Sequence, residues 1–211
     1  MRDEFERQLA LLNEELTTMG GLIESAIANA VKALDDDEHS INKAYDYEKS
    51  IDNKEREIES LSLKLLLTQQ PVASDLRLIS AALKMITDME RIGDQAEDIV
   101  EIAATAKKKM LKKSKHIQRM AAATIDMVNK SVEAFIKKDL LIAEVSHNDD
   151  VVDALFEEIV NDLVDIIKKD EGTSEVLDML MVAKYFERIG DHAVNIAEWV
   201  QFSITGEHKR L

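Results

Sequence analysis

The chain has 211 residues and a formal net charge of −15, a charge that repels nucleic-acid phosphates and argues against sequence-independent DNA or RNA binding. Cysteine is absent, which excludes disulfides, zinc–thiolate sites, iron–sulfur clusters and cysteine nucleophiles. One proline, six glycines and abundant alanine, leucine, lysine and glutamate favour helix, and no alternating run of β-branched residues predicts a strand.

The N-terminal segment MRDEFERQLALLNEEL alternates charged residues with leucine and lacks the apolar core of a signal peptide. No uninterrupted apolar run approaches the roughly 18 residues that a membrane span requires. We therefore expect a soluble, cytoplasmic protein without direct membrane insertion, which meets a membrane only through a protein partner.

Apolar residues that recur every three or four positions predict a first helix over about 2–34. The polar run DDDEHS, residues 35–40, is expected to end it. The second helix is predicted over about 40–68, before Pro71, which lacks an N–H donor. The third helix is predicted over about 72–110.

The run KKKMLKKSK, residues 107–115, separates the third helix from the fourth. It is either a solvated helix end and linker or a docking patch for an acidic partner. Ser114 is expected to cap the fourth helix, which extends to about Lys138. The fifth and sixth helices are predicted over about 140–169 and 175–205.

The sequence contains an internal duplication. ERIGD at 90–94 recurs identically at 187–191, an offset of 97 residues, and shorter matches in the earlier helices keep an offset of 101. The predicted fold is therefore all-α, with two pseudo-symmetric three-helix bundles over residues 1–112 and 113–211.

Each copy of ERIGD lies on a helix that has one apolar face and one row of carboxylates, given about 100° per residue. Acidic pairs four residues apart on the second and fifth helices match these rows. The candidate metal ligands are Glu48, Asp52, Glu90, Asp94 and Asp98 in the first half, and Asp149, Asp153, Glu187, Asp191 and Asn195 in the second. Such oxygens on two antiparallel helices suit iron, manganese, magnesium, calcium or zinc. The alternative is the solvated face of an acidic bundle.

Two further features accompany these rows. Gly93 and Gly190 lie mid-helix, where glycine costs up to about 1 kcal/mol relative to alanine, and they predict the close approach of a neighbouring helix or ligand. On the fifth helix, apolar residues replace the two acids that continue the row on the second helix: Glu55 becomes Phe156 and Glu59 becomes Val160.

ERIGDQAEDI and ERIGDHAVNI, with TMGGLIE at 18–24 and QPVASDLRLI at 70–79, resemble the PhoU family of bacterial phosphate regulators over essentially the whole chain. The resemblance implies Glu/Asp-x-x-x-Asp motifs that hold multinuclear iron or zinc clusters, with manganese or magnesium less favoured. Asn195 stands where Asp98 does and adds no charge, which predicts weaker metal binding in the second half.

The resemblance also implies a function and partners. It implies a cytoplasmic negative regulator of phosphate uptake and phosphate-starvation signalling, which is not an enzyme. Its expected partners are the ATPase subunit of a Pst-type phosphate ABC transporter, a phosphate-sensing histidine kinase and a second copy of itself.

Two other readings remain open at this point. A carboxylate-bridged di-iron enzyme usually needs Glu-x-x-His on two helices, and this chain offers only Glu144 with His147. A structural helical scaffold without metal is the third possibility. The roles of Arg77 and Trp199 are left undecided.

Overall fold

The computed structural model describes residues 2–35, 37–69, 72–106, 114–139, 142–169 and 174–207. Every regular element within these ranges is an α-helix, and the all-α prediction is confirmed. In chain order they are α1 Arg2–Leu34, α2 Glu38–Gln69, α3 Ala73–Thr105, α4 Lys115–Lys137, α5 Ile142–Lys168 and α6 Ser174–Thr205. In the described part of the chain, no helix is long and apolar enough to cross a membrane.

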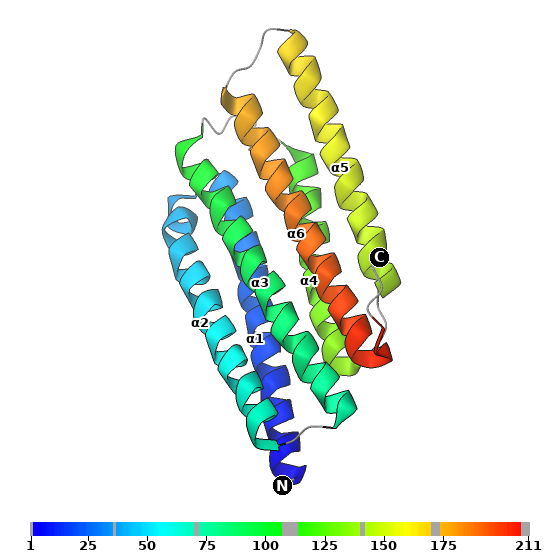
Figure 1. Ribbon diagram of the computed structural model, residues 1–211. Coiled ribbons are helices and arrows are strands. Elements are labelled where there is room, and N and C mark those ends of the chain that lie inside the picture. The colour runs from blue at the N-terminus through cyan, green and yellow to red at the C-terminus, as the bar shows by residue number, and fades with distance from the viewer. Residues whose placement is uncertain are drawn as a thin grey trace.

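The helices form two three-helix bundles that lie side by side (Figure 1). α3 packs along α6 and α1 packs along α4, whereas α2 and α5 occupy the two outer edges. The chain reverses direction at each turn, so the α2–α3 turn and the α5–α6 turn lie at opposite ends of the molecule (Figure 1). This arrangement confirms the predicted pair of pseudo-symmetric bundles.

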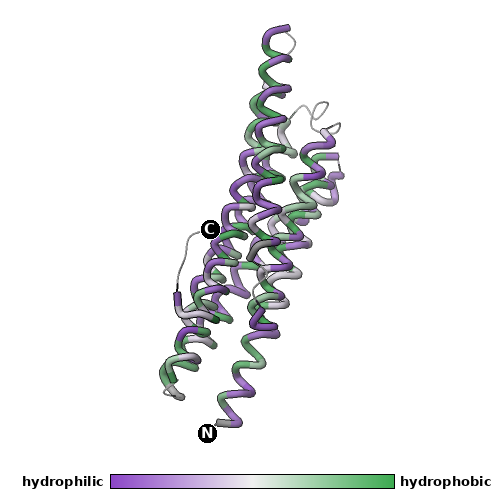
Figure 2. Tube along the Cα trace, turned by 90° about the vertical axis from the view of Figure 1, so that its right-hand side faces the viewer, coloured by the Kyte–Doolittle hydropathy of each residue, from purple (hydrophilic) through white to green (hydrophobic). Residues whose placement is uncertain are grey.

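Hydrophobic and hydrophilic residues alternate along the helices (Figure 2), as expected for helices with one apolar and one polar face. On α1 the core positions recur at three- and four-residue steps and are fully buried, namely Leu12, Leu16, Met19, Ile23 and Ile27. Helix faces of this kind supply the bundle cores.

Two helix starts are set by side-chain caps. α2 begins two residues earlier than predicted, because Asp37 accepts hydrogen bonds from the Ser40 hydroxyl at 2.6 Å and from the His39 backbone N–H at 3.2 Å. The predicted cap of α4 is confirmed, since the Ser114 hydroxyl accepts from the Ile117 N–H at 3.3 Å.

α3 ends at Thr105 rather than near 110, and Ala106 is extended with ψ of 151°. The Thr105 hydroxyl donates to the carbonyls of Glu101 and Ile102, and such local bonds compete with helix continuation. Residues 107–113 of the lysine-rich run lie outside the described residues. So do Pro71 and the predicted boundary between the halves.

The two residues whose roles the sequence leaves undecided lie along the contact between α3 and α6. The Arg77 guanidinium lies beside Gly206 at the carboxyl end of α6, where the helix dipole favours a positive charge. Trp199 packs edge-on against Phe202, with ring centroids 5.9 Å apart, and the Lys84 Nζ lies 6.0 Å from its ring. Both residues therefore help to join the halves.

Glycine brings the outer helices close to their neighbours. A Cβ on Gly93 would lie 2.9 Å from the Ile51 Cδ1 of α2, and a Cβ on Gly190 would lie 3.6 Å from the Val152 Cγ1 of α5. Ile51 and Val152 are equivalent under the offset of 101. The predicted close approach of a neighbouring helix is confirmed in both halves.

Alanine scanning of two glycines tests this packing. Gly21 has open space around its missing Cβ, so Gly21→Ala should stabilise the fold by up to about 1 kcal/mol through helix propensity. Gly93→Ala should instead lower the free energy of unfolding, because overpacking typically costs about 1–3 kcal/mol. Urea unfolding followed by circular dichroism measures both. Equal stabilisation by the two substitutions would mean that α2 moves away from α3 without cost.

A matched pair of buried serines gives a second test. Ser62 is fully buried and its hydroxyl has no hydrogen-bond partner among the described residues, whereas the hydroxyl of buried Ser131 donates to Met127 O at 2.8 Å. Ser62→Ala should raise the free energy of unfolding by about 1 kcal/mol, and Ser131→Ala should lower it. A loss of stability in both variants would reveal a partner for the Ser62 hydroxyl.

Candidate metal centre

The first acidic cluster lies between α2 and α3. Burial raises the pKa of Glu90, and the neighbouring carboxylates of Asp94, Glu55 and Asp52 raise it further. Burial likewise raises the pKa of Glu48, followed by repulsion from Asp52 and Asp94. The predicted ligands Asp52 and Asp94 are thus close enough to disfavour the charge of the other two, Glu48 and Glu90.

Glu97 belongs to this cluster although it is not among the predicted ligands. Burial, and then the charges of Glu48 and Glu101, raise its pKa from 4.5 to about 7. Glu97 and Glu48 also line a small cavity of about 10 Å³ together with Asn29 and Tyr47. The helical wheel signals this membership, because position 97 lies about 20° from position 90 on the side opposite Asp98.

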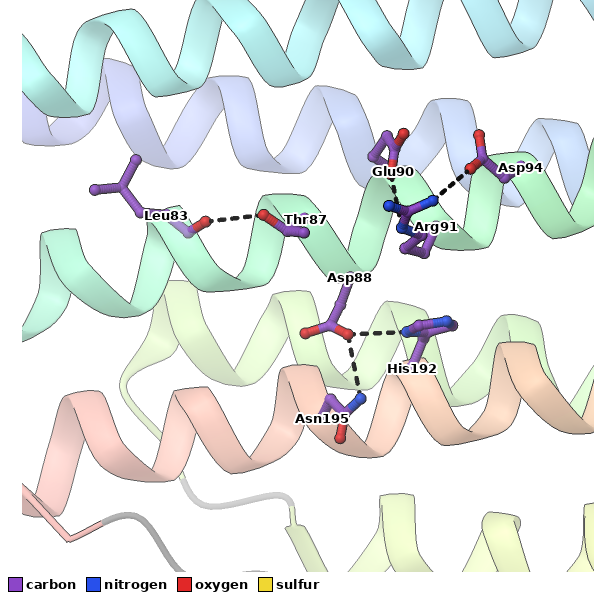
Figure 3. Close-up of polar contacts among 8 residues, drawn as sticks. All are labelled: Leu83, Thr87, Asp88, Glu90, Arg91, Asp94, His192 and Asn195. Carbon is purple, nitrogen blue, oxygen red and sulfur yellow. Dashed lines mark hydrogen bonds and ion pairs between the residues drawn. The ribbon is translucent and has the colours of Figure 1, made fainter.

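Two arginines partly neutralise the first cluster at its solvent side. Arg91 lies between two acids of its own helix, 3.5 Å from Glu90 and 3.3 Å from Asp94 (Figure 3). Arg56 pairs with Asp52 at 3.0 Å. Both arginine side chains are more than half exposed, so water screens these pairs, and the pKa of Glu90 stays raised in spite of Arg91.

The second cluster lies between α5 and α6 and contains Asp149, Asp153, Glu187 and Asp191. Burial, and then the charges of Asp153 and Asp191, raise the pKa of Asp149 to about 6. This cluster has its own cation, because the Lys184 ammonium forms a salt bridge with Glu187. At the position equivalent to Lys184 under the offset of 97, the first half has Thr87.

Two predicted ligands lie at the α3–α6 contact. Asp98 is hydrogen bonded to Tyr185 of α6. Asn195 donates to the Asp88 carboxylate at 3.2 Å, beside a contact of 2.9 Å between His192 Nδ1 and the same oxygen (Figure 3). The offset of 97 relates Asp98 to Asn195 and Asp88 to Tyr185, so these are equivalent contacts of the duplicated fold.

A helical wheel puts Asp98 and Asn195 on the acidic rows. It does not show which neighbouring helix that edge of each row faces. Figure 3 shows the division on α3: Glu90 and Asp94 are turned toward α2, whereas Asp88 points to α6. Asp98 keeps one link to the first cluster, since the charge of Asp94 contributes to its raised pKa.

The donor set of each cluster fits a hard cation. Every donor is a carboxylate oxygen, the ligand that hard cations prefer. Burial, and then repulsion between carboxylates, raises the pKa of Glu48 and of Asp149, and bound positive charge would offset both effects. As placed, no three His, Asp or Glu side chains of the described residues converge on one point. Binding therefore requires these partly exposed carboxylates to rotate.

The single Glu-x-x-His segment lies away from both clusters. The Glu144 carboxylate pairs with the Lys130 ammonium of α4 at 2.9 Å, and His147 is exposed. The salt bridge holds Glu144 at α4 rather than among the carboxylates between α5 and α6.

The raised pKa values predict how stability depends on pH. The folded state holds the Glu97 proton up to about pH 7, while the unfolded chain releases it near 4.5, so this contribution is full below pH 4.5 and is lost as pH rises to about 7. Glu97→Gln should therefore flatten the fall in stability across that window in chelator-treated protein. Glu14→Gln, at an exposed position on α1, serves as the control. An unchanged pH profile in Glu97→Gln would contradict the raised pKa.

Comparison with known proteins shows which proteins this chain is similar to. It matches the PhoU domain twice, over residues 16–103 and 117–200. It is 36% identical to the phosphate-specific transport system accessory protein PhoU homolog of Clostridium acetobutylicum, over 100% of this chain and 98% of that protein. It is 32% identical to the homolog of the same name from Pseudomonas aeruginosa, over 98% of this chain and 88% of that protein.

Solved structures agree. The crystal structure of PhoU from Pseudomonas aeruginosa matches with a TM-score of 0.84 at 30% identity, over 96% of this chain and 100% of that one. The phosphate transport system regulatory protein PhoU from Streptococcus pneumoniae, at 21% identity, shares the fold with a TM-score of 0.88, over 98% of this chain and 100% of that one. The chain belongs to the PhoU family.

Proposed function

We propose that this protein is a regulatory accessory protein of phosphate transport, acting in the cytoplasm as a metal-binding adaptor without catalysis. Family membership supports the regulatory role, because relatives that align with the whole chain are named phosphate-specific transport system accessory proteins. The observation that carries the metal-binding part is the carboxylate cluster repeated at equivalent places in the two halves.

Eight carboxylates would hold the metals. In the first half they are Glu48, Asp52, Glu90 and Asp94, and in the second half Asp149, Asp153, Glu187 and Asp191. We favour iron over zinc, because zinc sites usually recruit histidine or cysteine and the nearby His192 is engaged with Asp88. Manganese and magnesium are the competing hard cations. A bound cation supplies a positive charge at which phosphate oxygens bind, where bare carboxylates repel them.

The first cluster should bind metal more tightly than the second. Lys184 already neutralises part of the second cluster through its salt bridge with Glu187. The second half also has Phe156 and Val194 where the first has Glu55 and Glu97. Asn195 predicts weaker metal binding in the second half, and Lys184, Phe156 and Val194 support the same expectation for a different reason.

The proposed partners are the ATPase subunit of the phosphate transporter, the phosphate-sensing histidine kinase and a second copy of the chain. The names of the relatives support the transporter, and the family resemblance alone supports the kinase and the homodimer. In this role the protein represses phosphate uptake and starvation signalling when phosphate is plentiful.

Elemental analysis of untagged protein tests the metal sites. The parent should carry near-stoichiometric iron or zinc, with a larger loss in Glu90→Gln/Asp94→Asn than in Glu187→Gln/Asp191→Asn, because the first cluster has the higher charge density. Added metal should raise the melting temperature of the parent and not that of the first variant. Glu14→Gln/Asp165→Asn, which removes two exposed acids outside the clusters, should retain the metal.

A reporter of phosphate-starvation genes separates the two parts of the proposal. Deleting the protein should switch the reporter on in phosphate-rich medium, and an unchanged reporter would contradict the regulatory role. If the metal-free variants repress as well as the parent, the regulatory role stands and the metal is not needed for it. Absence of metal in the parent after incubation with excess iron, zinc and manganese would contradict the metal sites. It would mean that the clusters are the solvated face of an acidic bundle.

A further inference from the structure

The outer face of the α5–α6 hairpin differs in chemistry from its counterpart on α2–α3. Phe156 and Val160 stand where the first half has Glu55 and Glu59, and Leu177 stands where it has Ser80. Three polar positions of one hairpin are therefore apolar in the other. The duplicated fold supplies the comparison, because equivalent positions face equivalent neighbours.

Contacts between α5 and α6 fix how this face is assembled. The Lys184 Nζ lies 5.5 Å from the Phe156 ring, and the Gly190 position adjoins Val152, so the two helices run antiparallel in this register. About two and three turns closer to the α5–α6 turn than Phe156, α5 carries Val164 and Ile167, at the level of the start of α6. The end of α5 stands beyond the other helices at the top of Figure 1.

The side chains at this end of the hairpin are exposed. The exposed fraction is 41% for Val164, 56% for Ile167, 64% for Leu177 and 44% for Met181. Phe156 is half-buried and packs against the core beneath them. We call Phe156, Val160, Val164, Ile167 and Leu177 the hairpin face.

Exposed apolar side chains of this size concentrate at the two equivalent turns. Of the ten large hydrophobic side chains that are exposed in the described ranges, eight lie near the α2–α3 or α5–α6 turn. At the α2–α3 turn, Glu55 and Glu59 separate the apolar residues from the rest of the helix. Between the two hairpins as described, α5–α6 alone has apolar residues at these positions, where the partly exposed Phe156 and Val160 extend the apolar surface from the turn toward the acidic cluster. Continuous exposed apolar surface marks interaction sites.

The charge beside the hairpin face indicates which class of partner binds there. The hairpin face ends at the acidic cluster, where Asp153 and Asp191 are exposed. A second copy would bring the same acids and a further net charge of −15, and an anionic membrane surface is repelled in the same way. A helix with an apolar stripe and basic residues at one end matches both parts of the surface.

We propose that the hairpin face of α5–α6 is a docking site for an amphipathic helix of another protein, whose apolar stripe covers Phe156, Val160, Val164, Ile167 and Leu177 and whose basic end meets Asp153 and Asp191. The two hairpins therefore differ in one respect. Both carry an acidic cluster, and only α5–α6 adds an apolar face for a protein segment beside it.

Fluorescence anisotropy with a defined probe tests the site. The probe is a labelled helical peptide with leucines at i, i+3, i+4 and i+7 spacing and lysines in its last turn. It should bind the parent saturably and bind Ile167→Gln/Leu177→Gln at least about tenfold more weakly, since each about 1.4 kcal/mol of lost apolar contact is a factor of ten. Leu63→Gln/Leu67→Gln, the matched change at the other turn, should leave binding within about twofold of the parent.

A second variant and a second probe complete the test. Phe156→Glu/Val160→Glu introduces the glutamates that the first half has at these positions. This variant should bind the basic peptide more weakly than the parent does, although its negative charge is greater. A probe with glutamates in place of the lysines should bind more weakly than the basic one. Circular dichroism confirms that each variant is folded.

Three results would overturn the proposal. One is equal binding of the basic peptide to the parent and both α5–α6 variants, and another is equal binding of the acidic probe. The third is self-association, or co-sedimentation with anionic vesicles, that the Ile167→Gln/Leu177→Gln variant abolishes. Chelator-treated protein is used throughout, so failure here leaves the metal test untouched.

Discussion

The close packing of α2 on α3 at Gly93, repeated by α5 on α6 at Gly190, is the constraint on which the acidic clusters depend. Without a Cβ at these positions, the facing helix comes near enough to place its carboxylates beside those of the ERIGD helix. Partial burial, and then mutual repulsion, raises the pKa values of Glu90, Glu97 and Asp149. The structure keeps like charges together at an energetic cost, and a bound cation would remove that cost.

The halves share this constraint but compensate the charge differently. In the first half, Arg91 and Arg56 pair with acids from the solvent side, where water weakens them. In the second half, Lys184 sits between Glu187 and the Phe156 ring. The first half therefore keeps the greater unneutralised charge. The second half combines a smaller acidic cluster with an apolar surface, which is the basis for proposing a protein partner there in addition to a metal.

The contact between α3 and α6 joins the halves through a polar pattern that the duplication repeats. The pair Asp98–Tyr185 and the pair Asn195–Asp88 occupy equivalent positions, because the offset of 97 relates Asp98 to Asn195 and Asp88 to Tyr185. Residues used in this contact are held by a neighbour on the opposite helix. The first cluster and this contact are linked electrostatically, because burial, and then the charges of Glu101 and Asp94, raise the pKa of Asp98.

The helices, the duplication, the acidic rows and the two close-packed glycines were predictable from the sequence, because a 3.6-residue period and a mid-helix glycine are local signals. The neighbour that each edge of a row faces was not. A helical wheel gives the direction of a side chain from its own axis, and only packing decides which helix stands there. For this reason the sequence pattern groups Asp98 and Asn195 with the clusters, although they lie at the α3–α6 contact. The pattern does not identify Glu97 as a ligand, although Glu97 shares the first cluster.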